Sequence, residues 1–290
     1  MARRSFPVHG LVGGAVVLAA EALLLAGHRG AAEWFTPVVW TGYVLLLDAL
    51  VARLTGGSYL TTARLEAVLV ALVSVAAWWL FELYNAPRFW RGGEAARGLW
   101  WQYHGLEPDP FLRRVGYDWA FATIFPALFL TAAALRRAVF ARVRVRPWAP
   151  SPALTRLAVV VGAVAVALPL LVVNAWLVPF VWLGWIFLLE PLNVRAGLPS
   201  WLADLGRGDA SRLCALLVAG AICGVLWEFW NYWAAARWTY TVPYLGDVKV
   251  FEMPVLGYLG FPPFALECHA MYHRVRAWLL PGGRVPDPLI

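Results

Sequence analysis

The chain has 290 residues, of which 61% are hydrophobic and only 14% charged, and its mean hydropathy is +0.65. This composition leaves too little polar surface to cover a water-soluble globule and is typical of a protein that lies in a bilayer. The net charge of +7 does not indicate nucleic-acid binding, because the basic residues lie between apolar segments rather than on one soluble face. We therefore expect an all-α, multi-pass protein of the cell membrane.

Segments of about 20 mostly apolar residues, the length that spans a bilayer core, recur along the chain. They lie at residues 9–27, 34–53, 64–84, 116–136, 154–173, 175–193, 211–231 and 254–273. They predict eight transmembrane helices in two tandem four-helix repeats, residues 1–145 and 146–290. Because each repeat holds an even number of helices, both should face the same way, with a pseudo-two-fold axis along the membrane normal.

The evidence for two repeats is an internal similarity. Residues 78–85 read WWLFELYN and residues 226–231 read LWEFWN, so that each apolar segment ends on a Glu followed three residues later by an Asn. Residues 40–48 and 182–190 match upstream, and the W-x-Y elements at residues 101–103 and 238–240 match downstream. The spacing between matches drifts by a few residues, as insertions in loops would cause.

The positions of the basic residues also predict an orientation. Most of the arginines lie in the segments that are on the same side of the membrane as the N-terminus, including the Arg-rich and Pro-rich stretch 142–152. Basic residues favour the cytoplasmic side, so we expect both termini to be cytoplasmic. The loops at residues 85–115 and 232–253 are then external, and their Trp and Tyr residues are typical of the headgroup region.

Ionisable residues inside membrane segments are costly and are therefore candidate site residues. Glu82 and Asn85 are three apart and share a helix face, as do Glu228 and Asn231. If the two glutamates meet near the axis in a dry pocket, they cannot both ionise easily, and they would serve as general acid and general base while the asparagines orient them. The alternative is that each glutamate bonds a loop and each asparagine caps its helix.

The repeated aromatic residues are candidates for substrate binding. Trp101, Tyr103, Trp238 and Tyr240 would form a lid over an outer cavity, although anchoring in the membrane interface also explains tryptophans of this kind. Glu252, like Asp118, either joins this outer cluster or lies in the first turn of a helix, where an acid favours the helix dipole.

Asp48 and Glu190 match across the repeats near the inner ends of their helices and predict a second polar layer. Arg53 and Arg195 follow five residues later in each case, so we expect simple ion pairs there.

No metal or cofactor is expected. His269 and His273 have the spacing of two ligands for one metal ion, but a lone pair is weak evidence, and interfacial histidines are the alternative. The three cysteines, Cys214, Cys223 and Cys268, are interpreted as small core residues. No nucleotide-binding or hydrolase motif is present in the sequence.

We interpret the protein as an enzyme or binder of a lipophilic substrate, such as an isoprenoid, carotenoid, quinone or lipid. The substrate would enter laterally into an outer-side cavity and undergo carboxylate acid/base chemistry. Two alternatives stay open: a proton- or ion-coupled carrier, and a non-catalytic subunit of a membrane complex. The expected partner is a membrane lipid or a lipophilic small molecule rather than a nucleic acid, and assembly into a homo-oligomer or a membrane complex is an open alternative.

Overall fold

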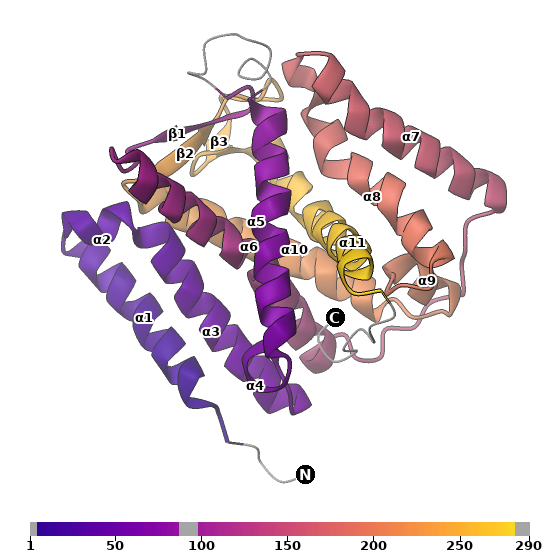
Figure 1. Cartoon of the computed structure of the whole chain (residues 1–290), viewed down its shortest axis with the longest axis horizontal. Coiled ribbons are helices and arrows are strands. Elements are labelled where there is room, and N and C mark those ends of the chain that lie inside the picture. Colours follow the sequence, from indigo (N-terminus) through magenta and orange to yellow (C-terminus); the bar gives the residue numbers. More distant parts are fainter. Residues whose placement is uncertain (1–4, 87–97, 282–290) are drawn as a thin grey trace.

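The computed structural model describes residues 5–86 and 98–281, and it is mostly helical (Figure 1). Its long helices are α1 (Val8–Leu25), α3 (Phe35–Thr55), α5 (Arg64–Asn85), α6 (Pro110–Ala138), α7 (Pro152–Leu171), α8 (Val178–Arg195), α10 (Ser211–Trp233) and α11 (Phe261–Leu279). Short helices connect them: α2 (Arg29–Glu33), α4 (Tyr59–Thr62), α9 (Trp201–Gly206), and the 3-10 turns η1 (Ala175–Leu177) and η2 (Val255–Gly260). The strands are β1 (Trp101–His104), β2 (Arg237–Tyr240), β3 (Lys249–Val250) and β4 (Met253–Pro254).

Within the described residues, seven helices are long and apolar enough to cross a membrane, as expected of a multi-pass helical membrane protein. The eighth long helix, α11, is not one of them. It carries Glu267, His269, His273 and two arginines, and most of it is buried by other helices rather than by lipid. The predicted segment 254–273 therefore begins too early, since residues 255–260 form η2 and the α-helix starts only at Phe261, ahead of two prolines.

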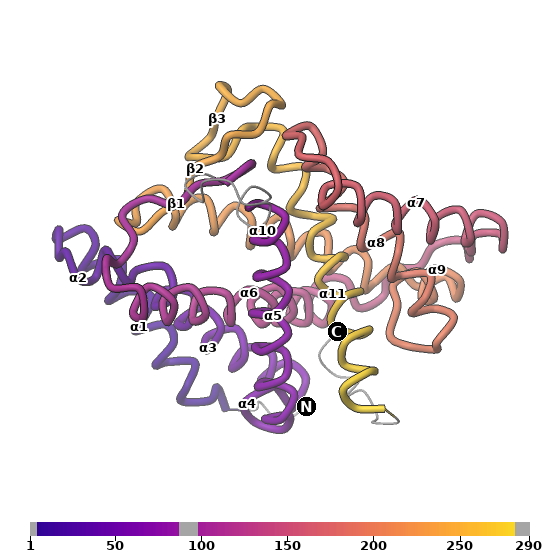
Figure 2. Tube along the Cα trace, turned by 45° about the horizontal axis from the view of Figure 1, so that its top comes forward, coloured from indigo at the N-terminus to yellow at the C-terminus, as the bar shows by residue number. Residues whose placement is uncertain are grey.

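The least buried helices lie at opposite edges of the molecule, with α1 on one side and α7 on the other (Figures 1 and 2). Of the most apolar 18-residue stretch of each helix, only 17% is buried in α1 and 22% in α7, against 72% in α6 near the centre. Glycines bring each edge helix close to its neighbour: a Cβ on Gly13 would lie 2.5 Å from the carbonyl oxygen of Gly42 in α3, and one on Gly162 would lie 2.3 Å from the backbone nitrogen of Leu188 in α8. Small residues allow such close packing in membranes.

Pro126 lies inside α6 without ending it. A proline in a helix interior removes a backbone hydrogen bond and opens the helix locally. Ser74 of α5 satisfies the backbone there, because its Oγ accepts from the N–H of Phe125 at 3.0 Å and donates to the carbonyl of Phe121. The α5–α6 contact thus stabilises the irregular turn and keeps α6 continuous through the core.

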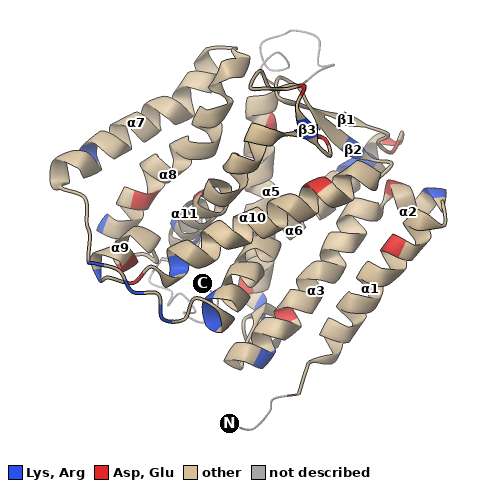
Figure 3. Ribbon diagram, turned by 180° about the vertical axis from the view of Figure 1, so that it is seen from behind, with Lys and Arg blue, Asp and Glu red and all other residues tan. Residues whose placement is uncertain are grey.

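Two connections far apart in sequence meet in a small ribbon at one end of the molecule (Figure 2). Strands β1 and β2 pair antiparallel, with Trp101 opposite Tyr240 and Tyr103 opposite Trp238. Because side chains alternate along a strand, these four aromatic residues share one face of the ribbon. The other end of the molecule, near α9, gathers many of the Lys and Arg residues (Figure 3).

Candidate functional site

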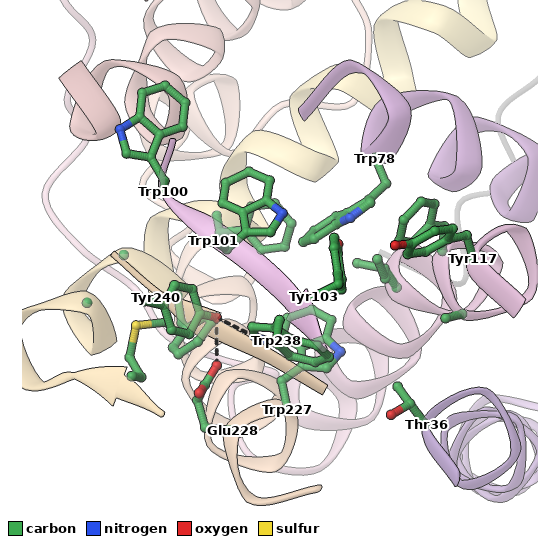
Figure 4. A pocket seen from close by; sticks show the side chains of 18 of the residues that line it. Thr36, Trp78, Trp100, Trp101, Tyr103, Tyr117, Trp227, Glu228, Trp238 and Tyr240 are labelled. Carbon is green, nitrogen blue, oxygen red and sulfur yellow. Dashed lines mark hydrogen bonds between the residues drawn. The ribbon is translucent and has the colours of Figure 1, made fainter. Parts of the chain in front are cut away.

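A cavity of about 460 Å³ lies against the aromatic face of the β1–β2 ribbon (Figure 4). Its walls come from α3, α5, α6, α8, α10, η2 and the start of α11, and they are mainly apolar and aromatic. The aromatic residues that line it, in addition to those of the ribbon, include Trp78, Trp182, Trp227 and Phe264. A cavity of this size and character is typical of a small-molecule binding site.

All four repeated aromatic residues, Trp101, Tyr103, Trp238 and Tyr240, line this cavity. The sequence did not predict that they form paired strands. Trp78, Trp182, Trp227 and Phe264 were missed as wall residues. Two of them could have been identified from their positions in the sequence, since Trp78 lies one turn before Glu82 and Trp227 lies next to Glu228.

The two asparagines hold the ribbon rather than face the cavity. The side-chain amide of Asn85 donates to the carbonyl of Trp101 at 2.9 Å, and its oxygen accepts from the N–H of Trp101 at 3.2 Å and of Trp100 at 2.9 Å. Asn231 does the same for Trp238, donating to its carbonyl and accepting from its N–H, both at 2.8 Å. Each asparagine therefore ties the end of a helix to a strand, a role that the sequence did not predict, and Asn85 also interacts with the carboxyl group of Glu82.

Glu82 is surrounded by donors. Its Oε1 accepts from the indole N–H groups of Trp78 at 3.2 Å and Trp101 at 3.0 Å, and from the hydroxyl of Tyr103 at 2.5 Å. Glu82 is not among the described residues that line the cavity. Its carboxylate instead holds the side chains of Trp101 and Tyr103 in place through hydrogen bonds.

Glu228 has a different environment, although its sequence setting is similar. It is fully buried and it lines the cavity. Its Oε1 accepts from the hydroxyl of Tyr240 at 2.8 Å, and that hydroxyl in turn accepts from the indole N–H of Trp238 at 2.7 Å (Figure 4). Its Oε2 has no hydrogen-bond partner in the described part of the chain. A buried polar atom without a partner is costly, so Oε2 is an unsatisfied group beside the cavity.

The predicted meeting of the two glutamates is not seen as a direct contact. Each carboxylate bonds the tyrosine of the strand that follows its own helix, Tyr103 for Glu82 and Tyr240 for Glu228. Of the two, the carboxyl group that faces the cavity is that of Glu228.

The two tyrosine hydroxyls act as fixed donors. Burial raises the pKa of Tyr103 well above its usual value, and the neighbouring Glu82 carboxylate raises it further. Burial and Glu228 raise the pKa of Tyr240 in the same way. Both phenols therefore stay protonated at neutral pH and keep donating to their glutamates.

The carboxylates of the second polar layer do not pair with the expected arginines. Asp48 accepts from the hydroxyl of Ser58 at 2.6 Å and contacts His9 at 3.0 Å, while Glu190 accepts from the hydroxyl of Ser200 at 2.6 Å. Each also accepts a backbone N–H from the first turn of the next short helix, that of Leu60 at 3.2 Å or of Leu202 at 3.0 Å. The predicted ion pairs are wrong because five residues correspond to about 140° around a helix, which places Arg53 and Arg195 on other faces.

The helix-dipole interpretation of Asp118 and Glu252 is also wrong. Asp118 lies well inside α6, where it accepts from the indole of Trp79 at 2.7 Å and pairs with Arg114 at 2.8 Å. Glu252 lies between β3 and β4, where no helix begins, and it is not among the described residues that line the cavity.

The histidines and cysteines lie deep in the structure. The rings of His269 and His273 are 4.3 Å apart, and both side chains are buried, so they are not interfacial. The described residues contain no group of three or more His, Cys, Asp or Glu side chains arranged to hold a metal. Cys223 and Cys268 are buried, and Cys214 is half-buried.

The sequence analysis also missed buried ionic contacts at the end opposite the ribbon. Arg276 pairs with Glu66 at 2.6 Å, and Arg212 pairs with Asp204 at 2.7 Å. The residues of each pair lie on different helices, so no local spacing could reveal them.

No family model, no curated protein and no solved structure matches this chain. Function is therefore inferred from the chemistry and geometry of the site itself.

Proposed function

We propose that this protein is a membrane-embedded binder or enzyme for a lipophilic molecule that occupies the aromatic cavity and presents a polar group to Glu228. The observation that carries this proposal is the Oε2 atom of Glu228, a buried carboxyl oxygen without a partner in the described residues, beside a cavity of about 460 Å³ whose walls are mainly apolar. Ligand sites commonly combine apolar walls with a few polar groups that fix orientation.

The walls favour an apolar or conjugated ligand. Aromatic rings contribute large contact areas and pack well against other π systems. An isoprenoid, carotenoid, quinone or other lipid fits these walls, and each reaches the protein from the bilayer. A hydroxyl or carbonyl group on such a molecule would find in Glu228 and Tyr240 a hydrogen-bonded pair at the cavity wall.

If the bound molecule reacts, Glu228 is the group placed to give or take a proton. A carboxyl group can do so when it lies within hydrogen-bond reach of the reacting atom. Tyr240 would hold the carboxyl in one orientation, and Glu82 would act at a distance by fixing Trp101 and Tyr103. Isomerisation, cyclisation or hydration would fit, because these reactions need no soluble cofactor.

We further propose that the chain is a tandem repeat, residues 1–145 and 146–290, with the cavity between the two units. Support comes from hydrogen bonds that recur at matching positions: Asn85 and Asn231 on their strands, and Asp48 and Glu190 on their short helices. With the basic end at the cytoplasm, the cavity would lie towards the outer leaflet.

The test is to purify the protein in mild detergent and identify retained small molecules by mass spectrometry. The wild type should retain a specific lipophile. Glu228→Gln should lose most of it, whereas Glu82→Gln, once shown to be folded, should lose less because Glu82 does not face the cavity. Equal retention by the wild type and a folded Glu228→Gln variant would contradict the proposal.

A further inference from the structure

Helix α11 carries a second buried carboxyl group that the proposed function does not use. Glu267 is fully buried, and both of its carboxyl oxygens are without a hydrogen-bond partner in the described residues. The indole nitrogen of Trp185 on α8, which packs against α11, is likewise buried, and it lies near the hydroxyl of Tyr84 without forming a well-aligned hydrogen bond. The backbone of Trp185 is close enough to lend the carboxyl group a weak hydrogen bond, although neither carboxyl oxygen has a partner of good geometry in the described residues.

This carboxyl group lies just below the cavity. Phe264 and Trp182 line the cavity with their ring centroids 5.3 Å apart, and Phe81 packs on both at 5.9 and 5.3 Å. Glu267 follows Phe264 by three residues, and α11 starts at the cavity and runs away from the ribbon. The two residues are therefore separated by about 4.5 Å along the helix axis, which places Glu267 close to this aromatic floor.

The surroundings of Glu267 offer little compensation for a negative charge, since the backbone of Trp185 supplies at most a weak hydrogen bond. The titratable groups that act on it are neutral: the Tyr84 hydroxyl of α5, which donates to the carbonyl of Val166 at 2.9 Å, and the Cys268 thiol. Deeper on α8 and α10, Glu190 and Arg212 each have their own partners. An ionised carboxylate buried without a partner would cost several kcal/mol.

A metal cation does not solve this problem. Hard cations take about six to eight oxygen ligands. No group of three or more ligating side chains occurs in the described residues, so the carboxyl of Glu267 would be the main donor. A proton needs no further ligands.

We propose that Glu267 is a proton-binding site, occupied at neutral pH, that exchanges its proton with water through the cavity when the rings of Phe81, Trp182 and Phe264 move. This inference is independent of the lipophile, since it concerns a carboxyl group behind the cavity wall. It gives the protein two separate carboxyl groups, Glu228 in the cavity and Glu267 beneath it.

Infrared difference spectroscopy tests the proposal directly. The spectrum of the wild type minus that of Glu267→Gln, both in lipid nanodiscs at neutral pH, should contain the C=O stretching band of a protonated carboxylic acid. The control is Asp247→Asn, which removes an exposed acid and should instead show loss of a carboxylate band. In D2O, the Glu267 band should shift to the position of the deuterated acid.

Two results would overturn the proposal: loss of a carboxylate band in Glu267→Gln, or an acid band that does not shift in D2O. If Glu267→Gln does not fold, Glu267→Asp serves instead and should move the acid band without removing it. Loss of the lipophile from the protein would leave the infrared result unchanged, so failure of the proposed function is distinguishable from failure of this inference.

Discussion

Glu82 and Glu228 lie in similar local sequences but make different hydrogen bonds in the fold. One oxygen of Glu82 takes three donors from Trp78, Trp101 and Tyr103. Glu228 accepts from Tyr240 on Oε1, and its Oε2 is buried without a hydrogen-bond partner in the described residues. At the scale of residues, therefore, an internal similarity in sequence located both carboxyl groups but did not reveal which one faces the cavity.

The tyrosines that hold these glutamates make the fold sensitive to alkali. Burial and the adjacent carboxylates raise the pKa of Tyr103 and Tyr240 well above the value of about 10 in an unfolded chain. Above about pH 10 the unfolded state loses protons that the folded state keeps, so stability falls as pH rises. The contribution of these two tyrosines to the free energy of unfolding is fully present below the pKa of tyrosine in the unfolded chain, about 10.

We predict that Tyr103→Phe/Tyr240→Phe loses stability less steeply than the wild type between about pH 9 and pH 11. The slope should differ by up to about 1.4 kcal/mol per pH unit for each tyrosine. Thermal unfolding in one detergent, followed across this range, measures the slopes. Parallel curves for the two proteins would show that these phenols ionise as freely in the fold as outside it.

At the scale of elements, two adjacent glycines of α1 give a matched pair. A Cβ on Gly13 would lie 2.5 Å from the carbonyl oxygen of Gly42, whereas one on Gly14 would meet nothing within 4 Å. Gly13→Ala should therefore lower the unfolding free energy by about 1 to 3 kcal/mol, because backbone atoms of α3 must move. Gly14→Ala should leave stability unchanged or raise it by up to about 1 kcal/mol.

The measurement is thermal unfolding of both variants in the same detergent. If the two alanines had equal effects, the close α1–α3 contact would be wrong.

The elements were largely predictable where composition alone decides them. Seven apolar segments became the expected helices with ends shifted by a few residues, because an apolar run of about 20 residues has few other folds in a bilayer. The start of α11 was not predictable, since its polar residues are buried by other helices. The expected ion pairs of Arg53 with Asp48 and of Arg195 with Glu190 do not form, because the partners of the two carboxylates come from turns that reverse the chain. The strands depend on a pairing across more than 130 residues, which no local pattern encodes.

At the scale of the whole molecule, the ribbon joins two distant connections and closes the cavity. Gln102 lies opposite Thr239 in the register. Opposed residues of an antiparallel pair have Cα atoms about 4.5 to 5.5 Å apart, within the range of a disulfide. In a background with the three native cysteines replaced, Gln102→Cys/Thr239→Cys should cross-link on oxidation, as seen by peptide mass spectrometry. Efficient cross-linking of the shifted pair Gln102→Cys/Thr241→Cys instead would contradict this register.

The cavity itself should respond to filling. Ala120 of α6 lines it, and Val115 on the same helix is 40% exposed and does not line it. Ala120→Trp should therefore reduce the amount of retained lipophile several-fold, while Val115→Trp should leave it unchanged. Mass spectrometry of both folded variants decides the outcome, and an equal loss in the two would mean that the lipophile binds elsewhere.

The central claim is that a lipophilic molecule occupies the aromatic cavity and contacts Glu228. It is tested most directly by an experimental density map of the protein taken from its native membrane into nanodiscs without added ligand. The account predicts elongated non-protein density in the cavity, with one end within hydrogen-bond distance of Oε2 of Glu228. A cavity that is collapsed or holds only water, with that oxygen bonded to a protein group, would contradict it.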